Sequence, residues 1–240
     1  MSRIYGLNAV EELIEAAPGA VAGVLYAGEP QGAVAQAIER ARAAGLAVRR
    51  VAPSALRSRS GRRGGASLGA DLRSAPSFDL DDLALEPAPL IVALDQVTDP
   101  HNLGAVMRSA AAFGAAAVVV TKDRSAPLND AAVRSSAGAV AYVPLIRVTN
   151  LARALRRLGA QGVWTVGTAA DGPQTLWDLD LTPPTAIVLG AEGKGLRPNV
   201  RKRCDLVAAL PLPGEVGSLN VSVTAGIALA EAARQRSGHR

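Results

Sequence analysis

Apolar residues in the first fifty positions alternate between the spacing of helices and that of strands. Residues 4–17 have apolar side chains at the three- and four-residue intervals of an amphipathic helix, and 20–26 read as a strand. A second helix is predicted at 32–44, ended by Gly45, and a second strand at 46–51. The pattern therefore predicts a small α/β unit at the start of the chain.

The periodic pattern stops between Pro53 and Arg73, where arginine alternates with serine and glycine. This composition predicts a flexible basic loop that either contacts phosphates or is a solvated surface loop. Residues 74–88 are rich in proline, aspartate and leucine and are typical of a linker. We therefore expect a first domain at 1–73, the linker at 74–88 and a second domain at 89–240.

Strands and helices alternate again in the second domain. Strands are predicted at 90–94, 118–121, 143–145, 162–168, 185–189 and 206–210. Helices are predicted at 102–113, 131–136, 150–158 and about 220–236. Nearly continuous apolar strands separated by helices indicate a largely parallel sheet buried on both faces. The fold class expected is α/β.

Positive charge distinguishes this chain from an average α/β protein. The net charge is +5 with a sequence pI near 10.0, and of 26 basic residues only Lys122, Lys194 and Lys202 are lysines. The planar arginine fork suits phosphate oxygens, so the composition favours a nucleic-acid partner. A GC-rich genome would also enrich arginine together with alanine and glycine, and this alternative stays open.

Cysteine and histidine are too sparse for several classes of site. Cys204 is the single cysteine, so no intrachain disulfide is expected, and His101 and His239 belong to no cluster with metal-ligand spacing. No signal peptide is evident at the start, and the apolar segment 110–120 is too short to cross a bilayer. We expect a cytoplasmic protein with no metal and no membrane partner.

Three segments place glycine and polar residues after predicted strands, where open α/β sheets bind ligands. They are 95–108, 189–195 and 210–222. Each also has an ordinary explanation, because 190–195 could be a tight turn, Arg108 a solvated helix residue, and Ser218 with Asn220 a helix cap. The glycine spacing matches neither a dinucleotide fingerprint nor a triphosphate-binding loop, which argues against a nicotinamide-dependent enzyme.

Taken together and in this order, the three segments closely resemble the signature motifs of the SpoU methyltransferases, within the wider SPOUT superfamily. The resemblance covers about Leu90 to Arg236. The residues at positions that the family uses are Asn102, Arg108, Gly190, Glu192, Gly193, Ser218, Leu219 and Asn220.

The first domain resembles the family's RNA substrate-binding domain, whose fold is similar to ribosomal protein L30e. Residues 4–13 carry the resemblance. Ser67-Leu68-Gly69 stands where close relatives usually have His-Gln-Gly, so the RNA-binding surface is expected to differ in detail. The fold implied is a small L30e-like α/β domain followed by a SPOUT domain with a parallel sheet and a deep trefoil knot.

The resemblance implies that S-adenosylmethionine lies bent in the knot and that the protein works as a homodimer. Cofactor-binding residues would be Thr168, within a loop at 166–168, together with Gly190, Leu210 and Leu219. The apolar face of the last helix and the helix after Asn102 are candidate dimer surfaces, although core packing is at least as good an explanation for each residue. The residues of that apolar face are Val223, Ile227, Leu229 and Ala230.

The catalytic residues implied by the family are Arg108, Asn102, Glu192, Asn220 and Ser218. Because a guanidinium stays protonated in proteins, Arg108 is expected first to hold a phosphate or a developing oxyanion. Asn102, Glu192 and Asn220 would position it, Glu192 through a charge-assisted hydrogen bond. Ser218 is the residue whose role is least defined.

The activity implied is methylation of a ribose 2′-hydroxyl in RNA. The nearest resemblance is to the bacterial branch that methylates a guanosine of 23S ribosomal RNA. Transfer RNA is an alternative substrate, and a non-catalytic RNA-binding assembly factor is an alternative function. Methylation of a base carbon is disfavoured, because it commonly uses a cysteine and Cys204 lies outside the three motifs.

Overall fold

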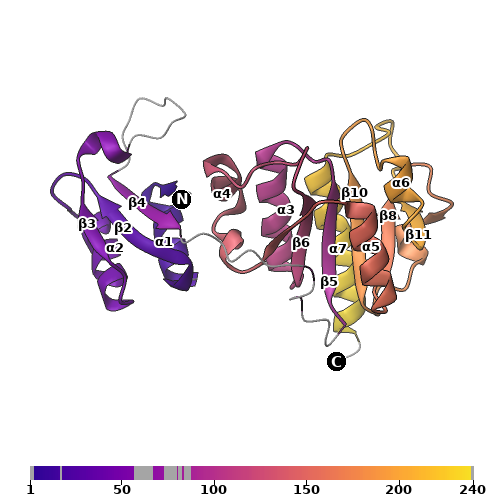
Figure 1. Ribbon diagram of the computed structural model, residues 1–240, viewed down its shortest axis with the longest axis horizontal. Helices are drawn as coiled ribbons and strands as arrows, with labels where there is room; N and C mark the ends of the chain where they lie inside the picture. The colour runs from indigo at the N-terminus through magenta and orange to yellow at the C-terminus, as the bar shows by residue number, and fades with distance from the viewer. Residues whose placement is uncertain are drawn as a thin grey trace.

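The computed structural model describes residues 3–16, 18–56, 67–72, 80, 83 and 88–238 (Figure 1). Its described strands form two sheets, one of four strands and one of seven. The basic loop expected around Arg57, Arg59, Arg62 and Arg63, and most of the expected linker, lie outside the described residues.

The N-terminal unit contains the four-stranded sheet, in the order β1-β4-β2-β3. Its strands are β1 (Arg3–Tyr5), β2 (Val21–Tyr26), β3 (Val48–Arg50) and β4 (Leu68–Leu72). Its helices are α1 (Leu7–Ala16) and α2 (Ala33–Ala43), with short 3₁₀ turns η1 (Pro18–Ala20) and η2 (Pro53–Leu56). The predicted alternation of helix and strand is confirmed for β2, α2 and β3.

Two features of this unit differ from the sequence-based expectation. Ile4 is not in the first helix but in β1, and Gly6, at φ +103°, turns the chain into α1. The basic loop predicted at 53–73 ends in β4, which pairs antiparallel with both β1 and β2. Both strands were missed because they are short, and their partners lie far away in the sequence.

The C-terminal unit contains the seven-stranded sheet, in the order β7-β6-β5-β10-β8-β11-β9, with every pairing parallel. Its strands are β5 (Leu90–Asp95), β6 (Ala117–Thr121), β7 (Leu145–Val148), β8 (Trp164–Thr168), β9 (Gln174–Thr175), β10 (Thr185–Gly190) and β11 (Leu206–Ala209). The predicted parallel sheet is confirmed. β7 begins later than expected, because Val143 still bonds to Ala139 at the end of a 3₁₀ turn.

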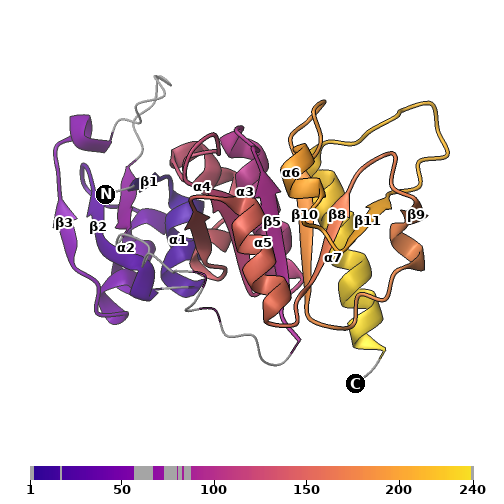
Figure 2. The same ribbon diagram turned by 45° about the vertical axis from the view of Figure 1, so that its right-hand side comes forward.

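Helices cover both faces of this sheet (Figure 2). They are α3 (Pro100–Ala112), α4 (Asp130–Ser136), α5 (Leu151–Ala160), α6 (Pro198–Arg201) and α7 (Val221–Ser237), with 3₁₀ turns η4 (Ala139–Ala141) and η5 (Leu176–Asp178). α3 and α7 pack in one apolar cluster, and α5 and α6 pack in another. Strand residues alternate between the two clusters: Val92 faces α3 and α7, whereas Ile91 and Ala93 face α5.

Side-chain caps fix the starts of the helices that carry polar motif residues. Asp99 accepts a hydrogen bond from the backbone of His101 at the start of α3, and Asn220 accepts one from Ser222 at the start of α7. Asn150 caps α5 by accepting from the backbone of Arg153. These bonds satisfy amide groups that have no partner within the helix, so each helix starts at a defined place.

The two units share apolar contacts through α4. Val133 of α4 is 2% exposed and belongs to the core cluster of the N-terminal unit, with Ile4 and Val10. Gly138, just after α4, lies against Glu12 of α1, so that a Cβ at Gly138 would be 3.0 Å from the Glu12 Cγ. The N-terminal unit therefore rests on the helix that follows β6.

Candidate active site

The carboxyl ends of four neighbouring strands meet at one edge of the large sheet, at the top of Figure 1. Gly190 at the end of β10 is paired with Asp95 of β5, and Thr168 of β8 is paired with Ala208 of β11. Thr168, which was expected in a loop, is the last residue of β8. The predicted cofactor residues Thr168, Gly190 and Leu210 thus lie on adjacent strand ends.

The segment 190–197 folds tightly over the end of β10. The backbone of Gly195 donates to the carbonyl of Ala191 at 2.8 Å, and a Cβ on Gly190 would overlap the backbone of Gly195 and Leu196. The packing of its own loop therefore requires a glycine at position 190, whatever its role toward the cofactor that the family resemblance implies. The tight-turn interpretation of this segment is confirmed.

A buried ion pair fixes the far side of the same loop. Asp95 is fully buried and accepts from the backbone N–H of Arg197 at 2.8 Å and from its Nε at 2.7 Å. Because a buried carboxylate is costly without partners, these bonds hold the loop against the end of β5. The sequence analysis did not single out Asp95 or Arg197, although Asp95 begins the first motif segment and Arg197 follows the second. The signal available in the sequence was an aspartate at the end of an apolar strand.

Three polar residues, one from each predicted motif, form a hydrogen-bonded cluster at this edge, which we call the amide–carboxylate cluster. Asn102 and Asn220 donate to the same Glu192 oxygen, Oε1, at 3.0 and 2.6 Å, and the Asn220 amide also lies 2.9 Å from Asn102 Oδ1. Asn102 is 9% exposed, whereas Glu192 and Asn220 are exposed. The sequence-based prediction that these residues act together is thus supported by direct contacts.

Arg108 lies on α3 but outside the amide–carboxylate cluster. It is exposed and makes no hydrogen bond or ion pair with another described residue, so the expected charge-assisted bond from the Arg108 guanidinium to Glu192 is not made within a single chain. Six residues along a helix amount to a rise of about 9 Å and a rotation of about 240°, which directs Arg108 to another side of α3 than Asn102. The contact is therefore not made within one chain, and the role of Arg108 stays a prediction.

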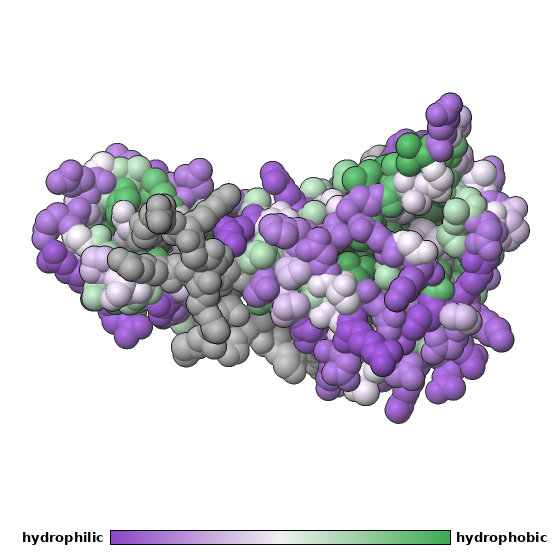
Figure 3. All heavy atoms as spheres, turned by 90° about the horizontal axis from the view of Figure 1, so that it is seen from above, coloured by the Kyte–Doolittle hydropathy of each residue, from purple (hydrophilic) through white to green (hydrophobic). Residues whose placement is uncertain are grey.

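The segment from Leu212 to Leu219 links β11 to α7 at the same edge. Its backbone N–H groups make no hydrogen bonds with other described residues, which leaves several donors available. Leu210 and Leu219 are half-buried, and Ser218 is exposed. Figure 3 looks down onto this edge, and exposed apolar residues gather among polar ones at the end of the molecule far from the N-terminal unit.

Cys204 packs against β8 on the face of the sheet that α5 and α6 cover. A Cβ added at Gly167 would be 2.9 Å from the Cys204 Sγ. Burial, reinforced by the nearby Asp205 carboxylate, raises the pKa of the Cys204 thiol to about 12. The residue is therefore an uncharged thiol at neutral pH and a poor nucleophile. This chemistry agrees with the exclusion of a cysteine-based mechanism.

Within the described ranges, no group of three or more histidine, cysteine, aspartate or glutamate side chains is arranged to hold a metal ion. The helices of the described ranges include none that combines the length and apolar character needed to span a membrane.

With this geometry established, comparison with known proteins identifies the class. Residues 89–230 match the SpoU rRNA Methylase family, and the chain belongs to that family. It is 41% identical over 238 residues to the 23S rRNA (guanosine-2′-O-)-methyltransferase RlmB of Vibrio parahaemolyticus serotype O3:K6, a match that covers 97% of this chain and 96% of that relative. The enzyme of the same name from Xylella fastidiosa is 45% identical, covering 98% and 96%.

Solved structures give the same assignment. The SpoU methyltransferase AviRb from Streptomyces viridochromogenes, in complex with the cofactor AdoMet, superposes with a TM-score of 0.82 at 28% identity over 98% of this chain and 90% of that one. The AdoMet-bound rRNA methyltransferase from Sinorhizobium meliloti gives a TM-score of 0.80 at 27% identity, over 97% and 87%. The likeness extends through both units of the chain.

Proposed function

We propose that this protein transfers a methyl group from S-adenosylmethionine to the ribose 2′-hydroxyl of a guanosine in 23S ribosomal RNA. The amide–carboxylate cluster carries the proposal, because it joins all three motifs at one sheet edge in a chain whose full-length relatives are named for this reaction. The arginine-rich, basic composition suits an RNA substrate.

The sheet edge has a donor set that fits the cofactor. S-adenosylmethionine supplies an electrophilic methyl group on a sulfonium. Thr168, Gly190, Leu210 and Leu219 would hold it, helped by the available backbone donors between Leu212 and Leu219. Backbone groups and half-buried leucines suit the adenine and ribose of such a ligand, because orientation needs only a few polar contacts in an apolar setting.

The chain's own residues then act on the RNA. The 2′-hydroxyl oxygen bonds to the methyl carbon as the sulfur–carbon bond breaks, and its proton leaves to solvent or to a nearby acceptor. Arg108 holds the adjacent phosphate or the developing charge on oxygen, because it cannot accept the proton. Asn102, Glu192 and Asn220 orient the substrate, and Ser218 beside them is an additional hydrogen-bonding group.

The topology at this edge supports a knotted chain. β10 lies between β5 and β8, and the chain returns after β11 through Leu212–Leu219 to bring Asn220 against Asn102. We propose that this return threads the loop and forms the deep trefoil knot of the SPOUT domain, spanning 89–240. We also propose that residues 1–73 form an L30e-like RNA substrate-binding domain and that 74–88 link the two.

A homodimer would complete the site. Val223 is 48% exposed and Ile227 and Ala230 are half-buried, so together they give α7 an outward apolar stripe beside α3. Leu229, also expected on that surface, is fully buried in the chain's own core, so it does not belong to the outward stripe. Dimerisation through this stripe would bring a second copy close to the exposed Arg108. Because ribosomal RNA is the substrate, we place the protein in the cytoplasm.

The acceptor atom provides the direct test. An RNA with 2′-deoxyguanosine at the target should bind but accept no methyl, and mass-spectrometric mapping should find one 2′-O-methyl missing from 23S RNA in cells without the protein. Equal methyl transfer to the deoxy substrate would contradict the proposal and indicate base methylation. If the missing 2′-O-methyl were found in transfer RNA instead, the proposed reaction would stand, but the assignment of 23S ribosomal RNA as the substrate would be wrong.

A further inference from the structure

A cavity of about 510 Å³ lies on the α5 and α6 side of the large sheet. It is lined by Trp164 and Thr165 at the amino end of β8, whereas Thr168, at the candidate active site, ends the same strand. The cavity is therefore separate from the amide–carboxylate cluster. Its volume falls in the range of small-molecule binding sites.

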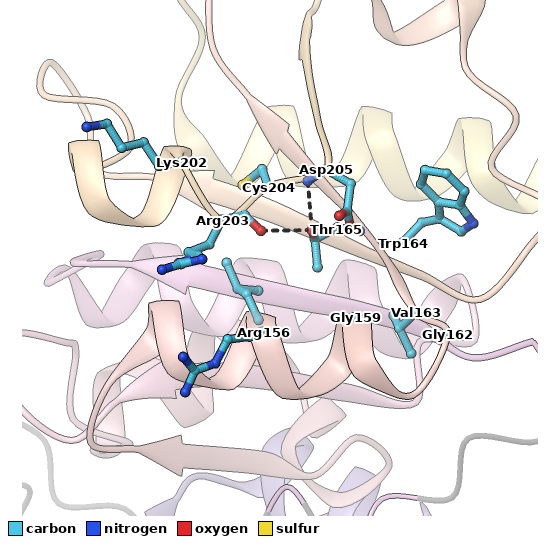
Figure 4. A pocket seen from close by; sticks show the side chains of 11 residues that line it. Arg156, Gly159, Gly162, Val163, Trp164, Thr165, Lys202, Arg203, Cys204 and Asp205 are labelled. Atoms are coloured by element: carbon cyan, nitrogen blue, oxygen red, sulfur yellow. Dashed lines mark hydrogen bonds between the residues drawn. The ribbon is translucent and has the colours of Figure 1, made fainter.

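Cationic and aromatic side chains stand at opposite ends of this cavity (Figure 4). Arg156 of α5 and Arg203, in the turn after α6, direct their guanidinium groups to the same end. Trp164 stands at the other end and is 52% exposed, although tryptophan is usually largely buried. The arrangement presents these two guanidiniums and a flat aromatic face to one hollow, and Lys202 is a third cation in its lining.

The cationic end is not neutralised by the described part of the chain. The side chains of Arg156 and Arg203 are exposed and make no ion pair with a described residue, whereas neighbouring Arg201 is paired with Asp171 at 2.7 Å. Asp205 is the acidic residue in the lining, and its Oδ2 accepts from the Thr165 backbone and hydroxyl at 2.8 and 2.6 Å. Because neither guanidinium is paired with a described carboxylate, the two favour an anion that bridges them.

Two glycines leave open space on the wall formed by α5 and the turn after it. A Cβ at Gly159 or at Gly162 would meet no heavy atom within 4 Å. No heavy atom of the protein therefore crowds these two positions of the lining. Base stacking on an aromatic side chain, with the phosphate on basic residues, is the general mode by which proteins bind single-stranded nucleic acid.

We propose that this cavity is a second RNA-binding site, which takes one unpaired nucleotide with its base on Trp164 and its phosphate between Arg156 and Arg203. The inference rests on the proposed function only in taking RNA as the source of that nucleotide. A free nucleotide shares the chemistry, and the experiment separates the two sources. An acidic peptide would suit the arginines but has no base for Trp164.

Tryptophan fluorescence gives a local test in the full-length protein. Trp164 and Trp177 are the two tryptophans, so the Trp177→Phe variant reports on Trp164 alone. A short oligouridine should quench this fluorescence saturably, and added salt should weaken binding. Arg156→Ala with Arg203→Ala should weaken it about tenfold or more, as should Gly159→Leu, which fills the cavity, whereas Gly159→Ala should bind normally.

Turnover on the RNA substrate provides a second readout. Trp164→Ala should raise KM about tenfold with kcat unchanged, because the site holds RNA away from the reacting ribose. Trp177→Ala, which removes another exposed tryptophan, should change neither constant.

Failure of this inference is distinguishable from failure of the proposed function, since quenching requires no methyl transfer. Active methylation without quenching by oligouridine would overturn the second site alone. Quenching in a protein that methylates no RNA would leave the second site standing and overturn the proposed activity. Uridine monophosphate binding as tightly as the oligomer, or polyglutamate competing equally with it, would overturn the assignment to RNA.

Discussion

Arg108 is the charged residue of the predicted catalytic set that lies exposed and makes no hydrogen bond or ion pair with another described residue. Arg108→Ala should lower turnover about a hundredfold or more, the scale for losing one positioned charged donor. Its thermal unfolding should match the parent protein, because no folded-state contact is removed. Arg134→Ala, an exposed arginine of α4, is the matched control for both measurements. Near-normal turnover of the Arg108 variant would remove that residue from the site.

Replacing Asn102 by aspartate would add a second titratable group to the amide–carboxylate cluster. In Asn102→Asp a second carboxylate would lie beside Glu192 Oε1, where the Asn102 amide is now 3.0 Å away. Two carboxylates sharing a site raise the pKa of one of them above its unfolded value. Stability is then greatest at acid pH and is lost as the pH rises through that raised pKa.

The variant should therefore unfold at a lower temperature than the parent protein at neutral pH, and the difference should shrink as the pH is lowered. Thermal melts across this pH range, run beside the parent protein, measure the difference. A destabilisation that is the same at every pH would mean that Asn102 and Glu192 are not in contact.

Elements with strong apolar patterns were predictable from the sequence, and short ones were not. The sequence placed three long elements to within a few residues, namely β5, β10 and α7. Each contains many apolar residues, because it is buried in the core. β1 and β9 contain three and two residues and exist through pairing with distant strands. Local sequence does not encode that pairing.

The same limit applied to the candidate site. The family motifs indicated Asn102, Glu192 and Asn220, which bond to one another. They did not indicate the orientation of Arg108, which follows from its phase on α3, nor the pairing of Asp95 with Arg197 across the loop. Contacts between residues about a hundred positions apart need the three-dimensional fold.

The last helix has one buried face and one outward stripe, and this difference predicts how copies of the chain associate. Val223→Glu should convert the proposed dimer into a monomer and abolish most methyl transfer, because a charge would be buried at the interface. Light scattering with a parallel activity assay measures both. Trp177→Glu, which alters an exposed apolar residue outside α7, should leave the mass unchanged. An active monomeric parent protein would contradict the expectation.

At the scale of the whole molecule, the two units should be separable but not independent. A fragment starting at Pro89 should fold and bind S-adenosylmethionine, since the large sheet and the amide–carboxylate cluster lie within it. It should lose most RNA affinity with the basic N-terminal region. Calorimetry with the cofactor and a filter-binding assay with RNA test the two halves of this expectation, and unchanged RNA binding would contradict it.

Removing the N-terminal unit would also expose Val133, which is now buried beneath that unit. The fragment should therefore self-associate, and Val133→Ser in the fragment should reduce this without affecting cofactor affinity. Size-exclusion chromatography of the two fragments makes the comparison.

The position of α4 between the two units has a mechanical consequence. Val133 ties this helix to the N-terminal core, while the backbone of Ala132 touches α3 so closely at Gly104 that a Cβ there would overlap it. α3 carries both Asn102 and Arg108. Close-packed helices move as rigid neighbours, so if the N-terminal unit binds RNA as proposed, a shift of that unit would be transmitted through α4 to the helix that bears Arg108. On that proposal, RNA recognition at one end of the molecule and alignment for methyl transfer at the other would be joined by a single seven-residue helix.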